Sequence, residues 1–118
     1  MDEYSDERKA KFKTITIDID KDGNGQGKFR ANGYFEAIIL PALISNPNIR
    51  IYSVDNEYVI FNHKGSTPRR RVFFPRVQLC DTNGILLDYF DKIYINGDVV
   101  IEVKGYIPDS SIQIMVII

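Results

Sequence analysis

The stretch Thr14-Ile15-Thr16-Ile17-Asp18-Ile19-Asp20 alternates isoleucine with a polar residue at every step. Successive side chains of a β-strand point to opposite faces, so this pattern predicts a strand with one buried face. Similar short apolar segments follow, separated by Gly, Pro, Asn and Asp. They are residues 28–30, 34–40, 49–54, 58–62, 71–74, 77–80, 92–95, 98–104 and 111–118. Residues 85–90 fit a strand or one helical turn equally.

These segments predict an all-β fold, a single antiparallel β-sandwich (or flattened barrel) of about eight or nine short strands. The β domain spans residues 13–118. Residues 1–12 form a charged N-terminal arm, which is either a solvated tail or a segment that orders against a neighbour. Asn96-Gly97 is a hairpin signal, since this pair favours a tight two-residue turn. The predicted core is Ile15, Ile17, Ile19, Phe35, Ile49, Ile51, Ile60, Leu79, Ile101, Val103, Ile112, Ile114 and Val116.

The residues that follow the first strand, Asp18 to Gly27 (DIDKDGNGQG), resemble the start of a calcium loop. An EF-hand loop places oxygen ligands on alternate residues, then a glycine, and closes with a bidentate Glu. A register from Asp18 uses Asp20 and Asp22 and would close at Phe29, and a register from Asp20 uses Asp22 and Asn24 and would close at Ala31, so neither supplies the closing acid. Asp, Asn and Gly also favour tight turns. We therefore expect a hairpin connection and no metal, although a weak ion shared by the aspartates stays open.

Few residues suggest catalytic chemistry. His63 is the only histidine, and we expect it in an exposed loop, so a zinc site is not predicted. Cys80 is the only cysteine, and its apolar neighbours indicate a buried hydrophobe rather than a nucleophile. No nucleophile-elbow pattern marks a serine. We expect no enzyme activity and no cofactor. No apolar stretch approaches the roughly 20 residues of a membrane helix.

The charge pattern has one unusual window. No acidic residue occurs between Glu57 and Asp81, whereas Lys64, Arg69, Arg70, Arg71 and Arg76 all do. Arginine interleaved with aromatics suits a protein interface and also a nucleic-acid surface. The plain alternative is a solvated loop. The net charge is only −1, which speaks against nucleic acid as the partner. Arg69, Arg70, Arg71 and Arg76 are therefore the predicted partner-docking residues.

The order of segments resembles that of small virion structural proteins of tailed bacteriophages. The resemblance rests on TITIDIDKDGNGQGKF and GYFEAIIL at the start and on FFPRVQL in the middle. It continues with NGDVVIEVKG and SIQIMVII at the end. It covers about residues 13–118 and is a pattern of β elements, not a catalytic signature. The charged N-terminal arm departs from the usual appearance of these proteins.

The resemblance implies a non-enzymatic virion protein, first of all a capsid auxiliary (cement or decoration) protein that docks on the shell. The implied partners are the major capsid protein, other virion proteins and further copies of the chain. The implied location is the virion, with the host cytoplasm before assembly. Two alternatives stay open. One is a neck, tail or head-fibre adaptor, and the other is a carbohydrate-binding or other ligand-binding sandwich that uses Tyr34, Tyr52 or Tyr58.

Overall fold

The computed structural model describes residues 11–55 and 58–118, and all regular elements in them are β-strands. This confirms the predicted all-β class. The strands are β1 (Phe12–Asp18), β2 (Gly25–Tyr34), β3 (Ala37–Leu40), β4 (Asn48–Ser53), β5 (Tyr58–Lys64), β6 (Arg71–Phe73), β7 (Arg76–Cys80), β8 (Leu86–Lys92), β9 (Tyr94–Lys104) and β10 (Ser111–Ile117). The described residues contain no helix that could span a membrane. Most of the predicted N-terminal arm lies outside the described residues, and Phe12 already belongs to β1.

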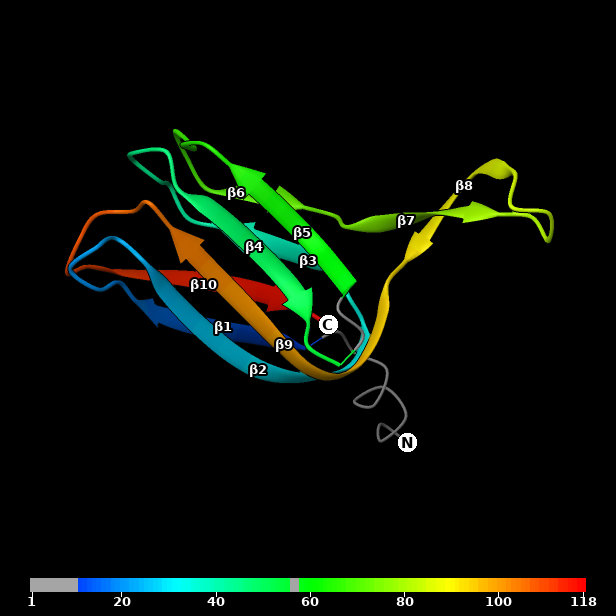
Figure 1. Cartoon of the computed structure of the whole chain (residues 1–118), viewed down its shortest axis with the longest axis horizontal. Helices are drawn as coiled ribbons and strands as arrows, with labels where there is room; N and C mark the ends of the chain where they lie inside the picture. The colour runs from blue at the N-terminus through cyan, green and yellow to red at the C-terminus, as the bar shows by residue number, and fades with distance from the viewer. Residues whose placement is uncertain (1–10, 56–57) are drawn as a thin grey trace, which may run out of the picture.

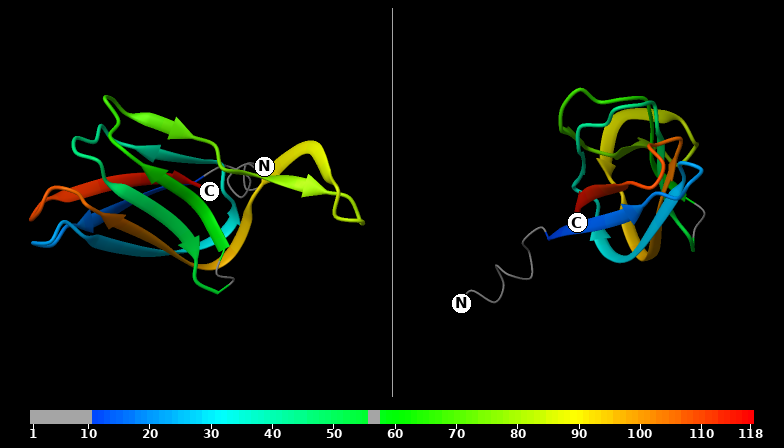
Figure 2. Two further views of the ribbon diagram at one scale, coloured as in Figure 1. Left: turned by 45° about the horizontal axis from the view of Figure 1, so that its top comes forward. Right: turned by 90° about the vertical axis from the view of Figure 1, so that its left-hand side faces the viewer.

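Eight strands form two four-stranded sheets, with the orders β1-β10-β3-β6 and β2-β9-β4-β5. The pairing is that of one long antiparallel hairpin, in which β1 pairs with β10, β2 with β9, β3 with β6 and β4 with β5. This hairpin is rolled up, because β10 also pairs with β3, and β9 also pairs with β4. Such connectivity defines a jelly roll, a β-sandwich of two sheets. Figures 1 and 2 show the two sheets facing each other, with β7 and β8 leaving them at one end.

The core lies between the two sheets and follows the predicted alternation. Ile17 of β1, Ile101 of β9 and Ile114 of β10 are completely buried. Ile15 is half-buried and packs against the same cluster. The remaining predicted core residues are also buried, with the exception of Leu79, which belongs to β7. The period of two therefore identified the inner faces of the jelly roll.

The glycine run after β1 has two separate roles. Gly23 has a φ of 85° and forms the turn that joins β1 to β2. Gly25 and Gly27 instead lie within β2. A Cβ at Gly27 would be 2.8 Å from Cγ2 of Ile15, and a Cβ at Gly25 would meet the backbone oxygen of Asp18. The two glycines therefore allow β1 and β2 to approach closely where the sheets meet.

The turn in the DIDKDGNGQG stretch occurs a second time in the chain. The Asp20 carboxylate accepts hydrogen bonds from the backbone N–H groups of Asp22 and Asn24, both at 2.9 Å. Asp81 accepts from Asn83 and Ile85 in the same pattern, at 2.9 and 3.0 Å. The second turn, DTNGI, has only one acidic residue. Because both turns have the same hydrogen bonds, turn chemistry accounts for Asp20 as it does for Asp81.

We expect Asp20→Asn to leave the free energy of unfolding unchanged, because the amide oxygen can accept the same two hydrogen bonds. Asp20→Ala removes the acceptor and should cost about 1 kcal/mol. Calcium should affect neither value, nor that of an Asp18→Asn, Asp20→Asn double variant. Urea denaturation with millimolar calcium or with chelator checks this. A calcium-dependent gain in the parent that the double variant loses would contradict the turn interpretation. No cluster of three metal-ligating side chains occurs within the described ranges.

The hairpin prediction at Asn96-Gly97 was wrong. Both residues lie inside β9, which continues from Tyr94 to Lys104. From Tyr94 to Val103, β9 is paired with β2, and Asn96 lies opposite Asn32. Gly97 has a φ of 149°, and a Cβ there would meet the carboxylate of Asp55. The glycine therefore makes room for a neighbouring loop, and the long ladder with β2 overrides the local turn preference.

Candidate docking surfaces

A two-stranded hairpin projects from one end of the jelly roll. Strands β7 and β8, within residues 76–92, pair only with each other and not with either main sheet. Figure 1 shows this projecting hairpin extending away from the sandwich, on the opposite side from the loops that join β1 to β2 and β9 to β10. An isolated two-stranded hairpin is at best marginally stable in water. A hairpin of this kind is expected to gain order when another surface covers it.

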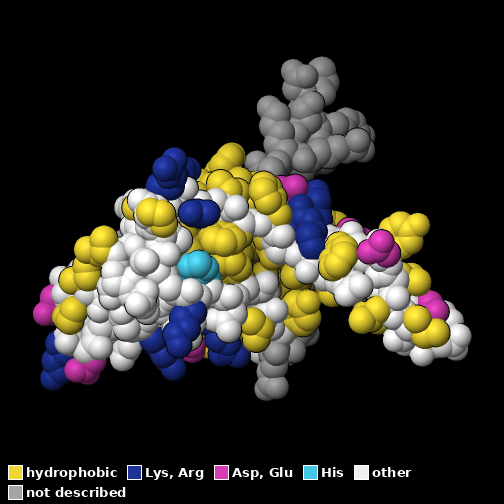
Figure 3. All heavy atoms as spheres, turned by 90° about the horizontal axis from the view of Figure 1, so that it is seen from above, with side chains coloured by type: hydrophobic (Ala, Val, Ile, Leu, Met, Phe, Trp, Pro, Cys, Tyr) yellow, Lys and Arg dark blue, Asp and Glu magenta, His cyan; other side chains and the backbone are white. Residues whose placement is uncertain are grey.

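The projecting hairpin exposes large apolar side chains that a folded core would normally bury. Ile85, Leu86, Tyr89 and Phe90 are between 61% and 68% exposed. Tyr89 and Phe90 are consecutive residues of β8, so the two faces of the hairpin each present an aromatic ring. Figure 3 shows these hydrophobic side chains together with acidic ones on the projecting part. Contiguous exposed apolar surface of this kind commonly marks an interaction site.

Two predictions for this segment were wrong. Leu79 was expected in the core and is 38% exposed, and Cys80 was expected to be buried and is exposed. The apolar alternation of β7 was read correctly as a strand. The error arose because β7 leaves the sandwich at Arg76 and carries its apolar side chains with it. Residues 85–90, which were ambiguous, belong mainly to β8.

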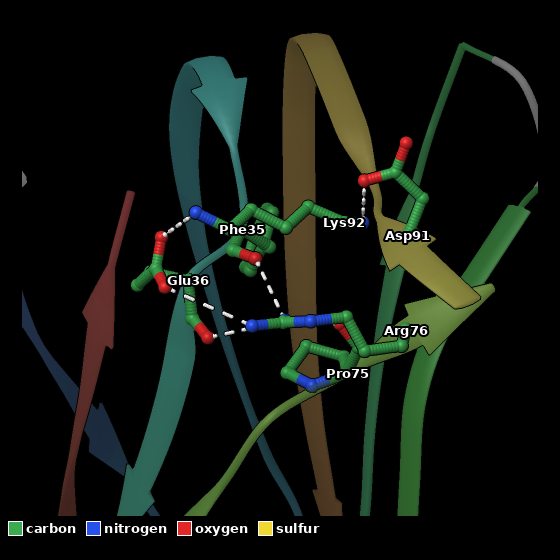
Figure 4. A network of polar contacts seen from close by, with 6 residues as sticks. All are labelled: Phe35, Glu36, Pro75, Arg76, Asp91 and Lys92. Atoms are coloured by element: carbon green, nitrogen blue, oxygen red, sulfur yellow. Dashed lines mark hydrogen bonds and ion pairs between the residues drawn. The ribbon is translucent and has the colours of Figure 1, made fainter. Parts of the chain in front are cut away.

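A network of polar contacts holds the base of the projecting hairpin. The Arg76 guanidinium donates through Nη1 to the backbone oxygens of Phe35, Glu36 and Pro75, at 3.4, 3.3 and 2.7 Å. Its Nη2 lies 3.7 Å from the Glu36 carboxylate, which also accepts a 2.6 Å hydrogen bond from Nζ of Lys92. Figure 4 shows both cations converging on Glu36. The two ends of the hairpin are thereby fixed to the connection between β2 and β3.

This network separates Arg76 from the other three predicted docking residues. Its side chain is only 26% exposed and its donors are used within the chain. Lys92 has the matching role on β8 and was not among the residues predicted from the sequence. The sequence contains a signal for this shared role, because Arg76 and Lys92 are the basic residues that flank an acidic and apolar segment. We therefore assign Arg76 to positioning the projecting hairpin.

Arg69, Arg70 and Arg71 form an exposed group that we call the arginine patch. They lie at the start of β6, which is the edge strand of its sheet. No ion pair joins these three arginines to a carboxylate in the part of the chain that the structure describes. Arg70 borders a groove of about 260 Å³ on the outer face of this sheet, lined also by Thr14, Ile39, Pro41, Gln113 and Met115. The patch thus combines positive charge that has no acidic partner among the described residues with a small, partly apolar hollow.

The outer face of the other sheet is different because its acids are already paired with bases, although Lys64 and Lys104 have no described acidic partner. Asp98 contacts Lys28 at 3.5 Å and Arg30 at 3.7 Å, and Glu102 contacts Arg50 at 3.8 Å. Tyr52 is half-buried on this face, where the Arg50 guanidinium lies 4.6 Å from its ring centroid. A row of exposed aromatic rings, as a carbohydrate platform would need, is therefore not formed around Tyr52.

The other two tyrosines proposed for ligand binding lie apart from Tyr52. Tyr58 begins β5 and pairs with Ser53, whereas Tyr52 pairs with Val59. Neighbouring positions of a strand face opposite sides, so Tyr52 and Tyr58 do not share a face. Tyr34 is exposed and packs edge-on against Tyr94 with ring centroids 5.1 Å apart. This pair lies near the base of the projecting hairpin, since Tyr94 follows β8 closely.

An aromatic cluster closes the sandwich where the edge strands β5 and β6 face each other. His63 of β5 stacks on Phe61 at 6.2 Å and lies 5.3 Å from Phe73 of β6, measured between ring centroids. His63 was expected in an exposed loop, and this was wrong, because β5 extends to Lys64 and turns the imidazole inward. Its Nε2 is buried and has no hydrogen-bond partner among the described residues.

We expect His63→Phe to raise the free energy of unfolding by about 1 kcal/mol, because a buried polar atom without a partner costs free energy that a ring of similar shape avoids. His63→Gln serves as the control and should give no gain, since it keeps a polar group in the same place. Denaturant unfolding of the three proteins measures the difference. A loss of stability in His63→Phe would show that the imidazole makes a contact that the chain needs.

No protein-family model, curated protein or solved structure is significantly similar to this chain.

Proposed function

We propose that this chain is a non-enzymatic structural protein of a virion that acts by docking into a larger assembly. The single observation that carries the proposal is the projecting hairpin. Polar contacts of Arg76 and Lys92 hold its base, and its large apolar side chains are exposed. The binding sites of enzymes and receptors are usually concave pockets, whereas this chain presents its apolar surface on a protrusion. A protrusion of this kind suits insertion into a neighbouring protein surface.

Two further considerations favour a virion as the assembly. The jelly-roll connectivity is used by viral capsid proteins, although lectins and cupins use it too, so this is an analogy at the level of fold. The β pattern of the sequence also resembles that of small phage structural proteins. Among the roles within a virion, a capsid auxiliary protein that docks on the shell formed by the major capsid protein accounts best for a small single domain with an exposed projection.

The proposal is tested by purifying virions through a density gradient from lysates in which the chain is produced. Quantitative mass spectrometry of the particle fraction should find the chain at a fixed ratio to the shell protein in repeated preparations. A high-salt wash should remove part of it if charged contacts at the rim contribute. If the chain stays entirely in the soluble fraction, or if its ratio varies with its expression level, the assignment to a virion is wrong.

A further inference from the structure

We infer that the projecting hairpin of one molecule docks, head to tail, on the arginine patch of a second copy of the same chain. The two surfaces lie at opposite ends of the molecule. Figure 1 shows that β6 begins at the end far from the hairpin and runs toward it. The hairpin therefore cannot reach the patch of its own chain. This contact is a property of the isolated protein, so it goes beyond the proposed place in a virion.

The charges of the two surfaces are opposite. Residues 77–91 contain Asp81, Asp88 and Asp91 and no Lys or Arg. The arginine patch consists of three exposed cations with no described acidic partner. The whole chain has a net charge of only −1, so the two charge groups are segregated along a nearly neutral molecule. Such complementarity favours one relative orientation of two copies and accelerates their encounter.

The apolar parts of the two surfaces are also complementary. On β8, Phe90 shares a face with Asp88, and Tyr89 shares the opposite face with Asp91. The groove beside Arg70 is lined partly by apolar side chains, and its volume of about 260 Å³ is below the roughly 300–1,000 Å³ of typical small-molecule sites. A groove of this size suits a single side-chain anchor. An aromatic anchor with a carboxylate two residues away on the same face would place its ring in the groove and the carboxylate near the guanidinium groups.

Other arrangements of two copies fit less well. Contact between two projecting hairpins would bring three aspartates toward three aspartates, and like charges across an interface are unfavourable. On the outer face of the sheet β2-β9-β4-β5, Asp98 and Glu102 are already paired with basic residues, whereas Lys64 and Lys104 at its end have no described acidic partner. A hairpin that docked there would have to disrupt those pairs. The arginine patch offers three consecutive cations without a described acidic partner, beside a partly apolar groove.

A head-to-tail contact has a consequence for the assembly. The two contacting surfaces are different, so an open assembly keeps one free hairpin at one end and one free patch at the other, and it can grow until a ring closes. We therefore expect species larger than a dimer at high protein concentration.

Charge exchange tests the inference in solution, without virions. One variant reverses the sign of two charges on the hairpin (Asp88→Lys, Asp91→Lys), and another reverses two charges of the arginine patch (Arg70→Glu, Arg71→Glu). Sedimentation velocity should show self-association at least about tenfold weaker in each than in the parent, because close charge pairs across interfaces contribute this much or more. An equimolar mixture of the two, and a chain carrying all four changes, should recover most of the association. Lys11→Glu with Lys21→Glu, an equal charge change at exposed positions, should behave like the parent.

Crosslinking gives a second readout that does not depend on charge. Cys80 is the only cysteine and is exposed on the hairpin. With Gln113→Cys, which adds a thiol in the groove beside Arg70, oxidation should give a ladder of linked oligomers. Gln26→Cys on the other sheet should not. A parent that stays monomeric at all concentrations would overturn the inference and would indicate that the hairpin binds a different protein. Preferential Cys80–Cys80 dimers in the parent, or reversed variants that associate like the parent, would overturn it as well.

Discussion

Shortening the projecting hairpin should abolish self-association while the jelly roll still folds. Val77 and Asp91 lie opposite each other in the β7–β8 ladder, so residues 78–90 can be replaced by Asn-Gly as a two-residue turn. The shortened chain keeps Arg76, Glu36 and Lys92 and hence the contacts at the base. It loses the exposed aromatic residues Tyr89 and Phe90, and anchors of this kind often carry about 2 kcal/mol or more each. We expect self-association to weaken at least about a hundredfold.

The stability of the shortened chain should change by less than about 1 kcal/mol, because exposed residues away from the core contribute little. Circular dichroism and denaturant unfolding check the fold, and sedimentation velocity measures the association. The full-length variant Tyr89→Ser, Phe90→Ser is the matched control, which retains the backbone of the hairpin and should associate as weakly. A shortened chain that fails to fold, together with a point variant that associates normally, would show that the hairpin serves the fold instead.

The largest loss of stability is expected from Ile101→Ala. Ile101 is completely buried at the centre of β9, where it lies between Ile51 of β4 and Gly27 of β2. Truncation removes buried methylene groups and leaves a cavity between two sheets that are fixed by backbone pairing. The cost should be roughly 3–4 kcal/mol. Urea unfolding measures it, and Lys104→Ala, an exposed position at the end of the same strand, should stay within about 0.5 kcal/mol of the parent. A loss near zero in Ile101→Ala would place the core on the other face of β9.

The sequence predicted most of the inner face of the jelly roll, and the physical reason is visible at β1 and β10. Ile17 and Ile112 lie opposite each other in the ladder, and both follow the alternation that a half-buried strand requires. A period of two identifies a strand and its buried face without any knowledge of the partner strand. It does not identify which strands pair, so the rolled-up hairpin of the jelly roll could not be read from the sequence.

Asn83-Gly84 correctly signals a hairpin between β7 and β8, but its projection from the sandwich was missed for the same reason. The segment Val77 to Cys80 has the composition of a core strand, and nothing local shows that its apolar side chains leave the sandwich. That outcome depends on Arg76 and Lys92, which are fixed by Glu36, a residue 40 positions before Arg76 in the chain. Contacts between such distant residues are not visible in a single sequence. The charge asymmetry was visible, however, and the predicted arginine patch depended on it.

Hydrogen–deuterium exchange of the hairpin amides is the most direct test of the claim that the chain acts through this element. In the dilute monomer, amides from Leu79 to Phe90 should exchange much faster than those at the centre of β9, because the hairpin lacks a covering surface. In the assembled state, exchange in the hairpin should slow by at least about tenfold, since a partner then stabilises it by more than roughly 1.4 kcal/mol. Amides of β9 should not change. Unchanged exchange of the hairpin on assembly, with protection appearing elsewhere, would contradict the claim.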